Sequence, residues 1–255
     1  MTAHAFHKNY VRSVLEMGGH YTGKDRLKLP GGRTLVLSPH YDDEVIGAGG
    51  TIMTQLSRGH RVSVIYLTDG REGIPKLEDR VEVERIRRGE SERARRILGV
   101  SEQAHLSAPE TRLRPTGPVL RKLTQMLKSF APELIFIPWF FDNHVDHVEA
   151  NMILYRIEKE LDVDIFILGY EVWTPLSPNL YVDVTRYASK KREALHCFSS
   201  QLEQVDYLRT SMALSRRRAL EAAIRGYAEA FLCLHAREYF DLIKRSGIAS
   251  MRFIM

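Results

Sequence analysis

The stretch T-L-V-L-S-P-H-Y-D-D-E, residues 34–44, joins a buried-strand pattern to a dense group of metal-binding side chains. Its first four residues form a short apolar run, and His40, Asp42 and Asp43 follow after Ser38 and Pro39. A second group, H-V-D-H at residues 144–147, follows another apolar run at residues 134–137. Imidazole and carboxylate ligands without thiolates are typical of a catalytic zinc site, which keeps one position open for water. We therefore expect one metal site built from two loops.

Strand-like and helix-like segments alternate outward from this stretch. The expected strands lie at residues 34–37, 62–67, 134–137, 165–168 and 181–184. The expected helices lie at residues 11–17, 46–59, 81–98, 119–130, 190–196 and 214–234. Strands separated by long helices imply right-handed crossovers and a mostly parallel sheet, so the pattern predicts an α/β fold. No linker-like stretch divides the chain, and we expect residues 1–255 to form a single domain.

Both metal-binding groups follow directly after expected strands, where parallel α/β sheets place their ligand sites. His40 and Asp43 are three residues apart in a tight turn that enters a helix, so both side chains can reach one ion. His147 would supply the third protein ligand, and water would take the fourth position. Asp42 projects differently and is placed to take the proton from the attacking water. The proline-containing segment 108–118 is expected to form a loop at the mouth of the site.

The remaining polar residues of the second group need separate roles. His144 could face the substrate and, as an imidazolium, stabilise an oxyanion or protonate a leaving amine. Asp146 could orient that ring by accepting its N–H. Together these roles describe the metal-assisted hydrolysis of an amide.

Composition narrows the range of partners. Of 255 residues, 44% are hydrophobic and 27% are charged, as in a globular protein. The formal net charge is +5, but the arginine-rich segment 85–96 is interleaved with glutamates, which predicts a solvated helix face and no nucleic-acid partner. The apolar stretch at residues 134–141 is too short for a membrane span, and residues 1–10 carry no apolar signal core. Cys197 and Cys233 lie in helix-like contexts and are expected to be buried free thiols of a cytoplasmic protein.

The two groups and their surroundings resemble the LmbE-like, or PIG-L, family of zinc-dependent N-deacetylases. Residues 38–52 are similar to a signature whose usual core is HPDDE, and residues 144–147 match the later HxDH motif. The similarity covers about residues 33–231. It implies a Rossmann-like three-layer fold, a Zn2+ cofactor and removal of the acetyl group from an N-acetylglucosamine-type sugar or its conjugate. It also implies the ligand and catalytic roles given above, and it adds Arg87 as a substrate contact.

Two residues inside the groups depart from the family pattern. Tyr41 stands where the family usually has proline, and its ring could contact substrate at the rim or pack inside. Asp142 stands where some members have a tyrosine, and it could favour a cationic or amine-bearing substrate. Both residues are candidate substrate contacts, although packing is the favoured role of the Tyr41 ring. Glu171 and Trp173 could also line the sugar site or form a pair at the sheet margin.

Two other functions stay open at this point. The same fold and metal could cleave another C–N bond in a natural-product or glycan pathway. A binding module for anionic glycans or nucleic acid would explain the basic pI of about 9.2, but it leaves the set of ligands and catalytic groups unexplained. The sequence predicts a small-molecule amino-sugar substrate and no membrane partner, and it leaves open a homo-oligomer and the identity of the sugar.

Overall fold

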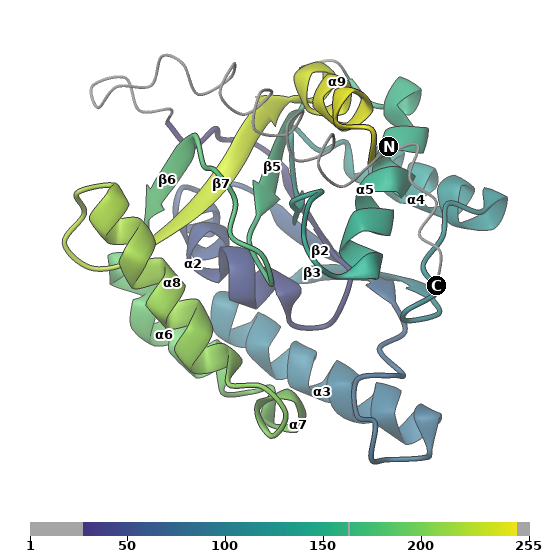
Figure 1. Cartoon of the computed structure of the whole chain (residues 1–255), viewed down its shortest axis with the longest axis horizontal. Helices are drawn as coiled ribbons and strands as arrows, with labels where there is room; N and C mark the ends of the chain where they lie inside the picture. The colour runs from purple at the N-terminus through teal and green to yellow at the C-terminus, as the bar shows by residue number, and fades with distance from the viewer. Residues whose placement is uncertain (1–27, 163, 249–255) are drawn as a thin grey trace.

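A computed structural model of the chain describes residues 28–162 and 164–248, which build one seven-stranded sheet (Figure 1). The strands are β1 (Thr34–Ser38), β2 (Val62–Thr68), β3 (Glu102–Ala108), β4 (Leu134–Pro138), β5 (Phe166–Tyr170), β6 (Leu180–Asp183) and β7 (Ala228–His235). Their order is β3-β2-β1-β4-β5-β7-β6, with β1 to β5 parallel and β7 antiparallel to both neighbours. The prediction of an α/β fold with a mostly parallel sheet is confirmed.

Helices cover both faces of the sheet and complete a three-layer fold (Figure 1). The α-helices are α2 (Asp43–Ser57), α3 (Arg80–Leu98), α4 (Gly117–Phe130), α5 (Val145–Arg156), α6 (Ala188–Leu195), α7 (Ser199–Leu202), α8 (Tyr207–Glu221) and α9 (Ala236–Ser246), and the short 3-10 helices are η1 (Glu158–Glu160) and η2 (Thr185–Tyr187). Helices α2, α3, α6 and α8 pack on one face, and α4, α5 and α9 pack on the other. Within the described residues, no helix combines the length and hydrophobicity that a membrane span requires. The helix predicted at residues 11–17 lies outside the described residues.

The sequence of β1 explains why a short strand sits in the middle of this sheet. All five of its residues are buried, and successive side chains point to opposite faces. Leu35 and Leu37 enter the core under α4 and α5, whereas Val36 enters the core under α2. A strand buried on both faces reads as a continuous apolar run, which is the pattern seen in the sequence.

The prediction of a helix at residues 214–234 is wrong for the second half of this segment. Helix α8 ends at Glu221, and Ala228–His235 forms β7 between β5 and β6. Alanine, glutamate and leucine favour a helix, but the gap between two strands overrides that local preference. Cys233 is therefore buried in a strand, and Cys197 is half-buried; both are free thiols.

Candidate functional site

Two loops meet where the strand order of the sheet reverses. The chain runs outward from β1 through β2 to β3 and then returns to place β4 on the other side of β1. At such a switch point a crevice opens beyond the carboxyl ends of the two neighbouring strands. The loop between β1 and α2 carries His40, and the loop between β4 and α5 carries His144, with 4.5 Å between the ring centroids. The two groups seen in the sequence therefore form one site.

Three atoms that could coordinate a metal ion form a nearly equilateral triangle in this crevice. The distances are 3.1 Å from His40 Nδ1 to Asp43 Oδ2, 3.2 Å from Asp43 Oδ2 to His147 Nε2 and 3.3 Å between the two nitrogens. Tetrahedral zinc with bonds of about 2.0–2.1 Å requires ligand atoms about 3.3 Å apart. Hydrogen bonds alone satisfy these three atoms poorly. If both ring nitrogens carried a proton and donated to the carboxylate, the two N–H groups would lie next to each other without an acceptor between them. The three side chains therefore fit one small divalent cation.

The charges in the triangle favour a cation. Burial alone lowers the pKa of His147, but the Asp43 and Asp142 carboxylates together outweigh burial and bring that pKa to about 9. Burial also opposes protonation of His40, yet its carboxylate neighbours raise the pKa well above the usual value. For Asp43 the two rings outweigh burial, and the pKa falls well below its usual range. The site therefore binds positive charge, which either protons or a metal ion can supply.

The Asp146 carboxylate lies behind His40. Its Oδ2 is 3.2 Å from His40 Nε2 and accepts the N–H of Thr111 at 2.7 Å, while Oδ1 accepts the N–H of Leu113 at 3.2 Å. The prediction that this carboxylate accepts the N–H of His144 is wrong, because only the backbone N–H of Asp146 meets that ring. A carboxylate behind a ligating histidine fixes the tautomer and orientation of the imidazole.

Asp142 holds the equivalent position behind His147. Its Oδ1 lies 3.2 Å from His147 Nδ1, and its Oδ2 accepts the N–H groups of Trp173 at 3.0 Å and Thr174 at 3.3 Å. The predicted substrate contact is wrong for this residue, because its side chain has 0% exposed surface and both oxygens are already engaged. Asp142 instead orients His147 and ties the segment after β5 to it.

His144 caps helix α5, and this contact decides its protonation. Its Nδ1 accepts the N–H of Asp146 at 3.2 Å, so the neutral ring carries its proton on Nε2. Burial, together with His40 and His147, lowers the pKa of His144 to about 4, so near neutral pH the ring is not the imidazolium that we expected. The three rings do place ligand atoms within 4.8 Å of one another. However, the cap occupies Nδ1 and leaves Nε2 protonated, which makes Asp43 the better third ligand.

Asp42 faces Arg87 in the same crevice. The Arg87 guanidinium lies 3.6 Å from Asp42 Oδ1 and donates to Glu110 Oε1 at 2.8 Å. Burial raises the pKa of Asp42 to about 6, although Arg87 pulls it down. A carboxylate with a pKa in this range can take a proton from water at neutral pH and later release it. Arg87 is buried between the two carboxylates and lines the cavity.

Sequence reasoning missed Glu110. It lies in the loop after β3, inside the segment that was predicted at the mouth of the site, and it is almost fully buried. Its Oε1 lies 3.8 Å from His40 Nε2, and its Oε2 accepts the N–H of Glu72 at 2.5 Å. The only signal in the sequence is an acid directly after Pro109, because β3 is too polar to be recognised as a strand.

Tyr41 packs beneath the loop and does not line the cavity. Only 1% of its surface is exposed, and its ring lies 5.0 Å from that of Tyr66 and 5.8 Å from that of His105. The predicted substrate contact is therefore wrong, and the packing alternative holds. Gly70 completes this fit with φ of 71°, since a Cβ there would lie 2.6 Å from the Tyr41 ring.

A buried ion pair holds helix α2, which begins at Asp43. Lys191 Nζ donates to Glu229 Oε1 at 2.7 Å and to the backbone oxygen of Ile46 at 2.8 Å. Ser211 Oγ donates to the same oxygen at 2.9 Å, while Glu229 accepts the N–H of Gly50 at 2.9 Å. These side-chain contacts from β7, α6 and α8 therefore hold the first half of α2 in place from outside the helix.

Glu44 anchors the same turn to the sheet. Its carboxyl group contacts Ser38 Oγ and Tyr66 Oη, each at 2.8 Å. Ser38 Oγ also donates to the backbone oxygen of His40 at 2.7 Å, so the single hydroxyl proton has two competing acceptors. Burial raises the pKa of Glu44 to about 8, which leaves a neutral acid that can donate to Ser38 instead.

A cavity of about 190 Å³ opens beside the triangle. Its charged lining includes Asp42, Glu72, Arg87 and Glu110, and its apolar lining includes Ile46, Val172, Trp173 and Tyr207. Glu171 and Trp173 were both candidates for the lining of the sugar site, and only Trp173 lines this cavity. Glu171 instead accepts a hydrogen bond from Arg218 Nε at 3.0 Å.

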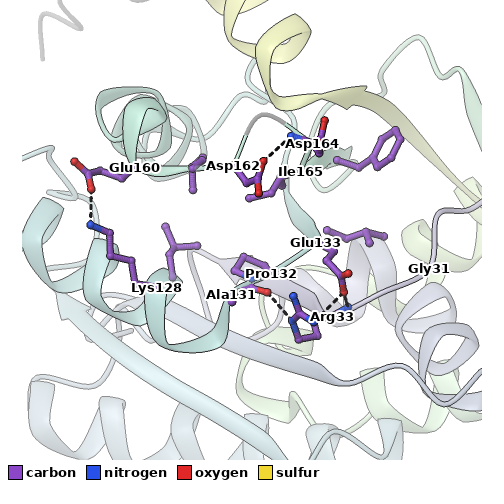
Figure 2. Close-up of a pocket in the computed structure, with 14 residues that line it drawn as sticks. Gly31, Arg33, Lys128, Ala131, Pro132, Glu133, Glu160, Asp162, Asp164 and Ile165 are labelled. Carbon is purple, nitrogen blue, oxygen red and sulfur yellow. Dashed lines mark hydrogen bonds and ion pairs between the residues drawn. The ribbon is translucent and has the colours of Figure 1, made fainter.

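A larger cavity of about 530 Å³ lies far from these residues, at the amino ends of β1, β4 and β5 (Figure 2). Its two cationic side chains, Arg33 and Lys128, each pair with a carboxylate of the same lining. Lys128 meets Glu160 at 2.6 Å, and Arg33 binds the backbone oxygen of Ala131 at 2.7 Å. Within the described part of the chain, its lining contains no histidine or cysteine, whereas the smaller cavity contains His40 and Asp43 of the triangle, so the smaller cavity is the candidate site.

Comparisons with known proteins show similarity to deacetylases. The profile of the family described as GlcNAc-PI de-N-acetylase (PIG-L) matches residues 35–157. The chain is 32% identical over 189 residues to diacetylchitobiose deacetylase of Thermococcus kodakarensis, which covers 68% of this chain and 71% of that protein. It is 26% identical over 174 residues to the uncharacterized deacetylase YaiS of Escherichia coli, covering 63% of this chain and 87% of that protein. The structure of N,N'-diacetylchitobiose deacetylase from Pyrococcus horikoshii superimposes with a TM-score of 0.74 at 25% identity, covering 94% of this chain and 95% of that one.

Proposed function

The chain belongs to the PIG-L family, and from this premise we propose that it is a zinc-dependent hydrolase that removes the N-acetyl group from an N-acetylglucosamine-type sugar or its conjugate. The single observation that carries the proposal is the triangle of His40 Nδ1, Asp43 Oδ2 and His147 Nε2, with edges of 3.1–3.3 Å. Relatives named as deacetylases of N,N'-diacetylchitobiose supply the substrate class. We also propose that residues 1–255 form one domain around the shared sheet.

In this proposal His40, Asp43 and His147 hold the zinc ion, and Asp146 and Asp142 keep the two rings in the ligating tautomer. When bound, zinc would polarise the amide carbonyl and lower the pKa of water. These roles explain why each ring has a carboxylate behind it and why both carboxylates are shielded from solvent.

The proton steps fall to groups beside the triangle. Asp42 takes a proton from the attacking water, and its pKa of about 6 allows it to pass that proton to the departing amine. Arg87 holds the Asp42 carboxylate in place and keeps it ionised. The neutral His144 ring uses Nε2–H to donate a hydrogen bond to the oxygen that gains charge in the transition state.

The test is acetate release from N-acetylglucosamine and N,N'-diacetylchitobiose by the zinc-loaded protein. Asp42→Asn should abolish turnover while the protein keeps its zinc and its fold, because only the proton acceptor is lost. His147→Ala should lose both turnover and bound zinc, as measured by metal analysis of the folded protein. Near-normal turnover in either variant would contradict the assignment.

A further inference from the structure

Trp173 is an exposed aromatic residue at the mouth of the candidate site. Its surface is 46% exposed, and the only other large hydrophobic side chains with comparable exposure in residues 28–162 and 164–248 are Val81 and Leu220. Of these three, only Trp173 lines the 190 Å³ cavity. The ring of Tyr207, which lines the same cavity, meets the indole edge-on at 5.5 Å and 74°. An indole held in this way at a cavity mouth offers a fixed apolar surface to a ligand.

The size of the cavity limits what fits inside. Pockets that enclose drug-sized ligands typically measure about 300–1,000 Å³. A volume of about 190 Å³ is below that range and suits a single sugar ring with its acetamido group. Any group attached to that sugar must therefore leave the cavity at its mouth, where Trp173 stands.

The chemistry of the lining suits a sugar bound in one orientation. Glu72, Arg87 and Glu110 offer charged partners for hydroxyl groups, whereas Trp173 and Tyr207 offer aromatic carbon. A pyranose ring also has separate polar and apolar surfaces, with hydroxyl groups around its edge and C–H groups on its faces. A second ring that follows the first out of the cavity would bring a C–H face against the exposed indole.

The backbone of Trp173 is connected to the triangle of His40, Asp43 and His147 through a hydrogen bond to Asp142. Its N–H donates to Asp142 Oδ2 at 3.0 Å, and the other oxygen of that carboxylate lies 3.2 Å from His147 Nδ1. A substrate group that packs on the indole is therefore held at a fixed position relative to His147, because Asp142 contacts both residues. Binding energy gained at such a remote contact can be used to orient the reacting amide.

We propose that Trp173, supported by Tyr207, binds a second sugar ring attached to the N-acetylamino sugar and makes the enzyme prefer N-acetylated disaccharides over the free monosaccharide. This inference rests on the proposed deacetylase function. Trp173 acts on specificity, because it contacts the part of the substrate that does not react.

The experiment compares kcat and KM for N-acetylglucosamine, its methyl glycoside and N,N'-diacetylchitobiose in zinc-loaded enzyme. We expect Trp173→Ala to lower kcat/KM for the disaccharide more than for the monosaccharide, by on the order of tenfold, mainly through KM. Trp173→Phe keeps an aromatic face and should retain most of the preference. Leu220→Ala removes another exposed apolar side chain, which does not line the cavity, and serves as the control.

A binding readout supplements the kinetics. Trp173 is one of only two tryptophans in the sequence, and the other, Trp139, is buried. In the Asp42→Asn variant, which cannot turn over, the disaccharide should change the tryptophan emission more than the monosaccharide does. The additional Trp173→Phe substitution should remove that difference.

Three outcomes separate the two proposals. Equal losses on both sugars in Trp173→Ala would overturn the specificity role while leaving the deacetylase function in place. A methyl glycoside that is turned over as well as the disaccharide would also overturn it, since no second ring would be needed. Failure of the unmodified enzyme to release acetate from any of the three sugars would overturn the proposed function itself.

Discussion

Asp142→Asn tests whether a buried carboxylate tunes the metal site. Asp142 Oδ1 lies 3.2 Å from His147 Nδ1, and Oδ2 accepts backbone N–H groups from Trp173 and Thr174. An asparagine has one acceptor oxygen and one donating amide. If its oxygen serves the backbone, its NH2 faces His147 Nδ1 and favours the tautomer with the proton on Nε2, the atom that belongs to the triangle. If it flips, NH2 faces two N–H donors and leaves buried groups unpaired.

Either arrangement should weaken zinc binding without unfolding the protein. Loss of a partner behind a ligating histidine typically costs about 10–100-fold in metal affinity, equivalent to about 1.4–2.7 kcal/mol. Competition with a chromophoric chelator at fixed pH measures the change. Asp183→Asn is the matched control, because that exposed carboxylate accepts the Thr185 N–H at 2.9 Å outside the site. A zinc affinity for Asp142→Asn that equals that of the control would refute the reasoning.

Further predictions concern the supports and charges of the site. Glu44→Gln should change the free energy of unfolding little, because a neutral amide replaces a group whose pKa is about 8, whereas Glu44→Ala should cost about 1–3 kcal/mol, because the buried Tyr66 hydroxyl loses this hydrogen-bond partner. Equal losses in urea unfolding would contradict this. Lys191→Met should cost about 3–5 kcal/mol, because it leaves the Glu229 carboxylate buried without its cation, and adding Glu229→Gln should recover part of that loss. No recovery in the double variant would count against the ion pair. Zinc uptake should release protons from His40 and His147, whose raised pKa values keep both rings protonated near neutral pH, so zinc affinity should rise with pH toward about 9. Calorimetry in two buffers of different ionisation enthalpy measures this release, and identical heats would exclude it.

The sequence predicts most of the central sheet because its strands are buried on both faces. Continuous apolar runs at residues 34–37 and 134–137 therefore stand out, and the side chains that follow them meet in one crevice. β7 is different, since Ala228–His235 reads as helix and becomes a strand only because β5 and β6 leave a gap between them. Pairing between distant segments decides this element, and no local pattern reports it.

The same distinction applies within the site. The predicted cluster of His40, Asp43 and His147 depends on short spacings and on strand ends, both of which are visible in the sequence. The partners of Asp142 and Asp146 depend on the direction of each side chain at and before the start of α5, which residue spacing does not determine. Spacing alone predicts which carboxylates are near the proposed metal site, and the structure is needed to show which ring each one supports.

The most direct test of the central claim is acetate release from N,N'-diacetylchitobiose before and after removal of the metal. If His40, Asp43 and His147 hold a zinc ion that drives the reaction, chelated protein should remain folded and release no acetate. One equivalent of zinc should restore the activity. Full acetate release from protein shown by metal analysis to contain no zinc or other transition metal would contradict the account.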